Sequence, residues 1–264
     1  PVKHTALGRF RHEAANIYVT GDGTVVAYSG DDERFEYIYK FVSSRKIKEG
    51  DLKHNMGILS EGTLYVGKFN GNSESEIDGS GELPKDGRFD GDIEWLPLMT
   101  AKADGKHESH VDGMSAEEVA VYTREAADKV GATKMDRPED VETNPVTGKV
   151  YAALTNNTKR TAVDEANPVI GNRDGHVIEI TERGGDHTST AFTWVILLLA
   201  GDPAVSSSAY FAGYPKEKVS PISCPDNLAF DEYGNLWIST DGNELGSHDG
   251  LFGVATAGPQ RGRV

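Results

Sequence analysis

The chain has 264 residues, which is enough for one large domain or two small ones with a substantial core. Its 42 acidic and 27 basic residues give a formal net charge of -15, which argues against nucleic-acid and anionic-membrane partners and favours cations. A soluble, secreted or salt-exposed surface explains the same charge equally simply. The single cysteine, Cys224, excludes an intramolecular disulfide and a site built from several cysteines.

The first patterned unit covers residues 9–32. It contains an acid, Glu13, then a turn glycine, Gly23, then strand-forming residues at 25–28, and it ends on Asp31 and Asp32. Similar glycine-led strands begin at four further positions, 62, 148, 175 and 234. Short strands at this density, separated by turn glycines, predict an antiparallel all-β architecture.

The middle of the chain departs from this pattern twice. Residues 70–92 are rich in glycine, serine and aspartate and predict a long surface loop. Ser115 and Glu118 then form a capping-box pair, and an apolar side continues until Gly131, which predicts one inserted helix that packs over a face of the β-structure. The apolar run at 194–200 is too short to span a bilayer and predicts a buried strand.

Two later units repeat the layout of the first. Residues 135–157 read MDRPEDVETNPVTGKVYAALTNN, and residues 225–243 read PDNLAFDEYGNLWISTDGN. Glu139 in one unit matches Asp226 in the other, and both align with Glu13 of the first unit. Glu13 and Glu139 are 126 residues apart, and Glu139 and Asp226 are 87 apart, close to three and two propeller blades of ~40–45 residues. We therefore expect one β-propeller domain over residues 1–264; a β-sandwich is the alternative.

Equivalent strand-start residues of different blades converge near a propeller axis, so Glu13, Glu139 and Asp226 are candidate ligands of one site. Close carboxylates repel one another, and a bound hard cation such as calcium, magnesium or oxidised iron is the natural compensation. The alternative is that each acid caps a local turn. Either Asp31 or Asp32 is a candidate further ligand, and both are equally well explained as turn residues.

Arg137 lies two residues before Glu139, so on an extended strand both side chains would point the same way. Its planar guanidinium is suited to gripping a phosphate or carboxylate ligand. A salt bridge to Asp136 or Glu139 is the competing role. No nucleophile elbow, phosphate-binding loop, dinucleotide fingerprint or EF-hand loop is present, so nucleophilic serine or cysteine catalysis has no support.

Four stretches of the chain together resemble the PhoX family of bacterial alkaline phosphatases: GRFRHEAA, YSGDDERFEYIYKFVS, GATKMDRPEDVETNPVTGKVYAALTNN and PDNLAFDEYGNLWISTDG. The resemblance covers nearly the whole chain. It implies a six-bladed β-propeller that hydrolyses small phosphate monoesters at a buried site containing iron and calcium, in a protein exported to the periplasm or secreted.

The resemblance also assigns roles to individual residues. Glu13, Glu139 and Asp226 are similar to the family's metal ligands, Asp32 to a calcium-side ligand, and Arg137 to the residue that contacts the substrate phosphate. The family's iron-ligating cysteine is expected upstream of residue 1, and Cys224 does not stand in for it. A further acidic ligand is expected beyond residue 264. The chain is thus expected to be truncated at both ends, about four blades long, and weakly active or inactive when isolated.

Two other functions remain open at this point. A calcium-dependent lactonase-type propeller is also similar to the stretch PDNLAFDEYGNLWIST. A non-catalytic propeller that binds calcium and a partner is the third. Arg137 and the DRPE string favour the phosphatase, because a neutral lactone has less need of an arginine.

Overall fold

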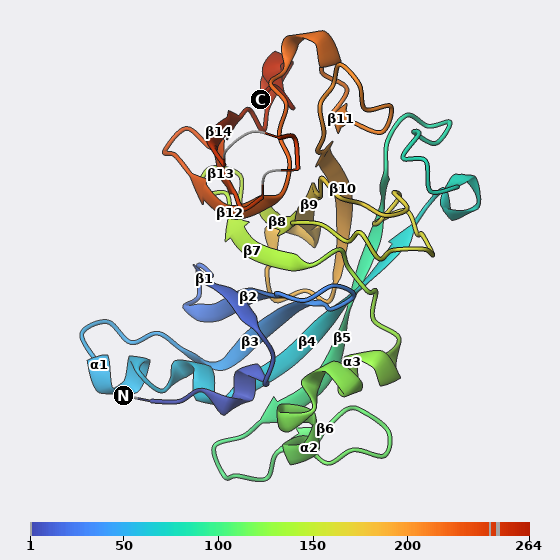
Figure 1. Cartoon of the computed structure of the whole chain (residues 1–264). Coiled ribbons are helices and arrows are strands. Elements are labelled where there is room, and N and C mark those ends of the chain that lie inside the picture. The colour runs from blue at the N-terminus through green and yellow to red at the C-terminus, as the bar shows by residue number, and fades with distance from the viewer. Residues whose placement is uncertain (1, 243, 247–248) are drawn as a thin grey trace.

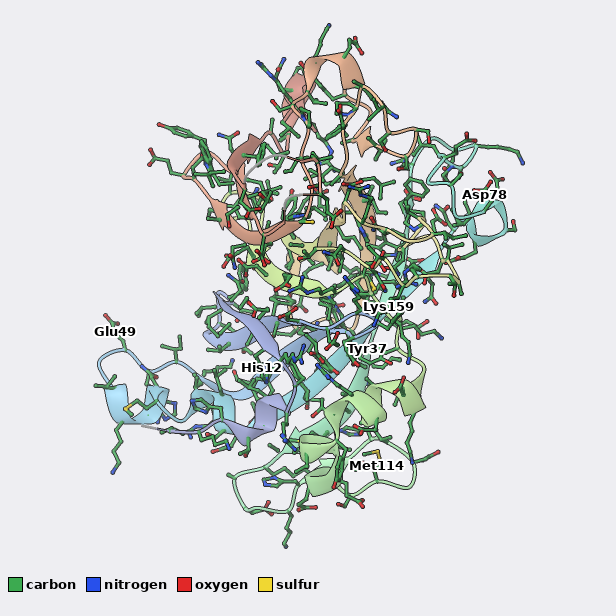
Figure 2. All side chains as sticks on the ribbon, in the orientation of Figure 1. His12, Tyr37, Glu49, Asp78, Met114 and Lys159 are labelled. Carbon is green, nitrogen blue, oxygen red and sulfur yellow. The ribbon has the colours of Figure 1, made fainter. Side chains whose placement is uncertain are left out.

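The computed structural model describes residues 2–242, 244–246 and 249–264; Asn243, which ends the third sequence unit, lies outside them. The protein has the all-β, propeller-like fold that was predicted, built from antiparallel meanders (Figure 1). Side chains fill the space between the ribbons of these meanders (Figure 2). Among the described residues, no helix has the length and apolarity needed to cross a membrane.

The first meander contains four strands in sequence order: β1 (His12–Val19), β2 (Thr24–Asp31), β3 (Ile38–Lys46) and β4 (Gly62–Gly71). All neighbouring pairs are antiparallel. β2 is almost entirely buried, whereas β1 alternates between half-buried and exposed residues. β1 is therefore at the outer edge of this meander, and β2 is part of its core.

The second meander contains β7 (Pro138–Thr143), β8 (Val150–Leu154), β9 (His176–Glu182) and β10 (Ala191–Leu199). The long strand β5 (Asp90–Ala101) pairs with β4 on one side and with β10 on the other. The two meanders therefore form one continuous sheet. The apolar run at 194–200 lies largely within β10, and β10 is buried along its second half, as expected.

The second sheet contains β12 (Pro225–Phe230), β13 (Leu236–Thr240) and β14 (Leu251–Val254). Two short strands extend the large sheet: β6 (Glu108–Ser109) pairs with β5, and β11 (Tyr210–Phe211) pairs with β10. The first strands of the three units, β1, β7 and β12, lie side by side, with β7 in contact with both of the others (Figure 1). This neighbourhood positions the acids that begin each unit.

The predicted inserted helix is present as two helices, α2 (Ala116–Val121) and α3 (Thr123–Val130). The capping box of Ser115 and Glu118 forms, and Gly131 ends α3 in the left-handed conformation, so both boundaries were predicted correctly. The expectation of one continuous helix was wrong, because Tyr122 leaves the helical conformation (φ -110°, ψ 51°). The remaining helices are α1 (Leu52–Asn55) and the 3-10 turns η1 (Thr5–Leu7), η2 (Ile58–Ser60), η3 (Glu74–Glu76), η4 (Arg183–Gly185), η5 (Lys216–Lys218) and η6 (Gly258–Gln260).

Candidate metal centre

The three acid-bearing strands share an irregular beginning. The pairing register shifts just after Glu13 in β1, after Pro138 in β7 and after Pro225 in β12. Each shift lies beside a non-glycine residue with a positive φ: Ala14 (60°), Arg137 (59°) and Cys224 (51°). Bulges and left-handed non-glycine residues are energetically costly and gather at functional sites, where they redirect side chains. The repeated acid in the sequence therefore marks a repeated backbone distortion.

Three carboxylates lie together near the beginnings of β1 and β7 and the end of β2. One oxygen of each of Glu13, Asp32 and Glu139 lies within 4.8 Å of the other two. They come from β1, from the residue after β2, and from β7, so residues 126 positions apart are brought into one group. Glu139 is buried and the other two are half-buried. We call Glu13, Asp32 and Glu139 the carboxylate cluster.

Asp226, the fourth predicted ligand, lies beside this cluster but is not part of it. Its negative charge contributes to a raised pKa of Glu139, and the charges of Glu13, Asp32 and Arg137 act on Asp226 in turn. The sequence repeats group Asp226 with Glu13 and Glu139. In the described residues of the structure, the third carboxylate beside Glu13 and Glu139 is that of Asp32.

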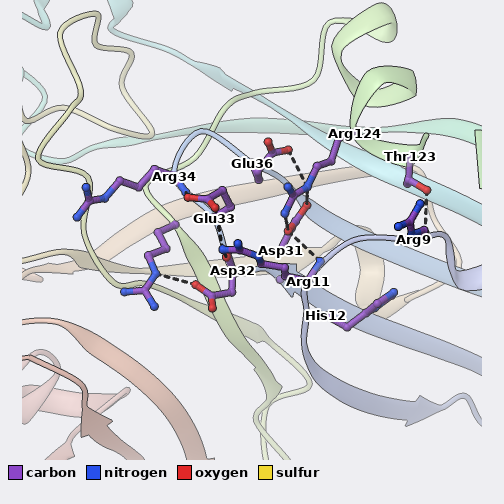
Figure 3. Close-up of polar contacts among 12 residues, drawn as sticks. Arg9, Arg11, His12, Asp31, Asp32, Glu33, Arg34, Glu36, Thr123 and Arg124 are labelled. Atoms are coloured by element: carbon purple, nitrogen blue, oxygen red, sulfur yellow. Dashed lines mark hydrogen bonds and ion pairs between the residues drawn. The ribbon is translucent and has the colours of Figure 1, made fainter. Parts of the chain in front are cut away.

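The structure separates Asp31 from Asp32, which the residue pattern had not done. Asp31 is fully buried and accepts hydrogen bonds from Arg124 of α3, with Nε–Oδ2 at 2.8 Å and Nη2–Oδ1 at 2.5 Å. Asp32 extends away from this pair and accepts a 2.6 Å hydrogen bond from Nε of Arg137. Figure 3 shows the two aspartates directed to different partners. The charge of Asp31 is therefore paired with Arg124 of α3, and Asp32 is the aspartate that belongs to the cluster.

Arg137 contacts two of the three carboxylates. Besides its bond to Asp32, its Nη2 lies 3.0 Å from Oε1 of Glu139. The predicted placement of Arg137 and Glu139 on one extended strand is wrong, because φ of Arg137 is 59°. The left-handed residue nevertheless turns its guanidinium to the same side. Asp136 is paired with Arg160 at 2.5 Å, so of the two salt bridges considered for Arg137 only that to Glu139 is present.

Burial and mutual repulsion raise the pKa values of these acids. Burial, contact with Asp32 and the charge of Asp226 raise the pKa of Glu139 to about 9. Burial and the charge of Asp241 raise the pKa of Asp226 to about 6, and burial followed by the charge of Asp32 raises the pKa of Glu13. Oε1 of Glu139 is buried and, among the described residues, accepts no hydrogen bond, although it lies at ion-pair distance from Arg137. Closely spaced carboxylates that repel one another in this way make the cluster a candidate cation site.

The donor atoms of the cluster are all carboxylate oxygens, which fits a hard cation and does not fit zinc held by nitrogen and sulfur. Cys224 is buried, and its Sγ lies 3.8 Å from Nδ2 of Asn156 and 3.6 Å from the carbonyl oxygen of Arg173. Burial raises the pKa of this thiol, so the thiol form predominates.

Two arginines near this centre are not among the residues predicted from the sequence. Arg34 donates from Nη2 to Oδ1 of Asn156 at 3.0 Å and pairs through its backbone with Asp136. Arg160 is 4% exposed and bonds to Asp136. Arg34 follows Asp32 closely in the string GDDERFEY and could have been noticed there. Arg160 lies in a segment without a periodic pattern, so nothing in the sequence marks it.

Without metal, the protein should lose stability as the pH rises from about 5 to about 9. Folded Glu139 keeps its proton up to about 9, whereas the unfolded carboxyl releases it near 4.5, so its contribution is complete below 4.5 and lost through pH 9. Lys40 makes the opposite contribution to the pH dependence: burial lowers its pKa to about 7, so its part of the stability rises as the pH increases above that value. Urea unfolding with a chelator present should show a shallower decline in the Glu139→Gln variant. Equal slopes in the two proteins would contradict the assignment.

Comparison with known proteins gives one family and one similar solved structure. The family model "Alkaline phosphatase PhoX" matches residues 1–262. The solved structure of Pseudomonas fluorescens PhoX in complex with vanadate, a transition state analogue, is similar with a TM-score of 0.74 and 39% sequence identity. The match covers 99% of this chain and 42% of that one, so this chain spans about two fifths of the length of that protein. No curated protein matches the sequence.

Proposed function

The chain belongs to the PhoX alkaline phosphatase family, and on that premise we propose that its carboxylate cluster is part of a metal-dependent phosphomonoesterase site. The observation that carries the proposal is the meeting of Glu13, Asp32 and Glu139 beside Arg137. The substrates are small phosphate esters. Export to the periplasm or secretion is part of the proposal, since family members are typically exported.

The proposed metals are calcium and iron. Glu13, Glu139 and Asp226 would be metal ligands, and Asp32 would be a ligand on the calcium side. The oxygen-only cluster supports calcium or oxidised iron, and Oε1 of Glu139, which is buried and paired with Arg137, is an oxygen that a cation could take over. When bound, such cations polarise phosphoryl oxygens and balance the charge that develops on them.

Arg137 is proposed to bind the substrate phosphate. Its side chain is 27% exposed, so it is held by Asp32 and Glu139 but is still reachable from solvent. Within the described part of the chain its Nη1 has no hydrogen-bond partner, which leaves one edge of the planar fork for a phosphoryl oxygen. The carboxylates therefore orient the arginine as well as offering oxygens to a metal.

The test is hydrolysis of p-nitrophenyl phosphate by the intact natural protein, with and without added calcium and iron. Turnover should depend on both metals, stop with a chelator and be inhibited by vanadate. A neutral lactone should be assayed in parallel. Calcium-dependent lactone hydrolysis without phosphatase activity would overturn the proposal in favour of a lactonase, and calcium binding without either activity would favour a non-catalytic propeller.

A further inference from the structure

A buried ion pair lies directly behind Arg137. Arg160, from the segment between β8 and β9, is 4% exposed, and its partner Asp136 is fully buried. Nε of Arg160 donates to Oδ1 of Asp136 at 2.5 Å. Asp136 immediately precedes Arg137 in the chain. A charge pair at this depth is costly to desolvate, and hydrophobic residues of similar volume are often equally stabilising. The presence of this ion pair next to Arg137 therefore needs an explanation other than its contribution to stability.

The other donors of Arg160 fix the backbone on either side. Its Nη2 donates to the carbonyl oxygen of Lys134 at 2.6 Å, and its Nη1 donates to that of Ala162 at 3.1 Å. The guanidinium also lies over the ring of Phe35, at 5.4 Å from the ring centroid. One side chain therefore joins the chain just before Arg137 to the segment after β8 and to the loop after Asp32.

The second oxygen of Asp136 is held as firmly as the first. Oδ2 accepts a 3.0 Å hydrogen bond from Nδ2 of Asn172. Oδ1 of Asn172 accepts from the backbone N–H of Gly175, and Nδ2 of Asn172 lies 3.2 Å from Nδ1 of His176. Nε2 of His176 lies 2.9 Å from the carbonyl oxygen of Ala166. Both carboxylate oxygens of Asp136 therefore accept a hydrogen bond from a buried side chain.

Backbone hydrogen bonds complete the support of this turn. The N–H of Phe35 donates to Met135, and the N–H of Met135 donates to Glu36, at 3.0 and 2.9 Å. On the other side, the N–H of Thr155 donates to the carbonyl oxygen of Arg137 at 3.1 Å. A left-handed conformation at an arginine is strained and persists only where the surroundings enforce it. These contacts are the surroundings that enforce it.

We propose that Arg160 and Asp136 are positioning residues, which lock Arg137 in its left-handed conformation and so aim its guanidinium at Asp32 and Glu139. The consequence for substrate rests on the proposed function; the consequence for the orientation of Arg137 does not. Neither Arg160 nor Asp136 is hydrogen-bonded or ion-paired to Glu13, Asp32 or Glu139, so removing the pair should disturb the arginine without removing a proposed metal ligand.

The experiment compares Arg160→Lys and Asp136→Asn with the unaltered protein, and Arg160→Met is included if it folds. Arg261→Met is the matched control, because Arg261 also bonds to a buried carboxylate, Glu179, and to a backbone carbonyl, at Thr256. Two readouts are needed. The first is hydrogen exchange of the Nε–H of Arg137 in protein labelled with 15N-arginine. The second is the affinity for orthophosphate and for calcium by titration calorimetry.

Exchange at Nε of Arg137 should become roughly ten-fold faster in Arg160→Lys and Asp136→Asn. Orthophosphate affinity should fall about ten-fold while calcium affinity is unchanged. The control variant should leave the exchange rate at Arg137, the orthophosphate affinity and the calcium affinity unaltered, even where its thermal stability is lower. Unchanged exchange at Arg137 in both variants overturns the positioning role. If the unaltered protein binds no orthophosphate, the proposed function fails, and the exchange measurement still decides the positioning role.

Discussion

Replacing Glu139 by glutamine is expected to weaken calcium binding by at least about 100-fold while leaving the metal-free protein folded. The pKa of Glu139 is raised to about 9, so near neutral pH and without metal this side chain carries a proton, and the amide is close to it in shape and charge. Glutamine offers calcium a single neutral amide oxygen in place of a charged carboxylate with two oxygens, so the attraction for the cation is much weaker. The loss of affinity should appear in calcium titration calorimetry, whereas urea unfolding in a chelator at pH 7 should show no loss of stability in the variant relative to the unaltered protein.

The matched control for this experiment is Glu182→Gln. Glu182 is as buried as Glu139, and burial raises its pKa to about 9 as well, but its partner is the hydroxyl of Tyr28 in the interior. Calcium affinity in this variant should equal that of the unaltered protein. An equal loss of calcium binding in both variants would mean that buried carboxyl groups support metal binding only through the fold, and the cluster would lose its assigned role.

Replacing Arg137 is expected to lower kcat/KM for a phosphate monoester by about 1,000-fold in the metal-loaded protein. Arg137→Gly is the cleanest deletion, because glycine adopts the φ of 59° without strain. Arg137→Lys should recover only part of the loss, since a point charge cannot reproduce the two-pronged contact. Steady-state kinetics with p-nitrophenyl phosphate measures both.

Calcium affinity should survive both substitutions, because Arg137 competes with a cation for Asp32 and Glu139 rather than assisting it. Arg45→Gly is the control: Arg45 pairs with Glu61 at 3.1 Å, and its side chain is 28% exposed, close to that of Arg137. It should retain full kcat/KM. Activity in Arg137→Gly within a few-fold of the unaltered protein would remove Arg137 from the phosphate site.

The repeated acids could be found from sequence because each occupies the same place before a turn glycine and a strand. That register places Glu13 in β1, Glu139 in β7 and Asp226 in β12, at the same kind of strand beginning. The family was also identified correctly from the strings around these residues. The repeats were therefore sufficient to predict the all-β architecture and the region of the site, because strand spacing and turn chemistry are local properties.

What could not be predicted depends on contacts between distant segments. The choice between Asp31 and Asp32 is made by Arg124, 93 residues away, which pairs with one aspartate and leaves the other facing the cluster. Arg160 lies in an irregular segment whose fold is set by buried hydrogen bonds rather than by periodicity. The break at Tyr122 likewise interrupts a helical pattern that the sequence carries without a visible stop.

The most direct test of the central claim is a calcium anomalous-difference map from crystals grown with calcium. We predict a peak between Glu13, Asp32 and Glu139, with carboxylate oxygens of all three about 2.3–2.6 Å away. Glu139 should then have released Nη2 of Arg137. A map with no peak at the cluster, and with Arg137 still bridging Asp32 and Glu139, would contradict the assignment of these carboxylates as a metal site.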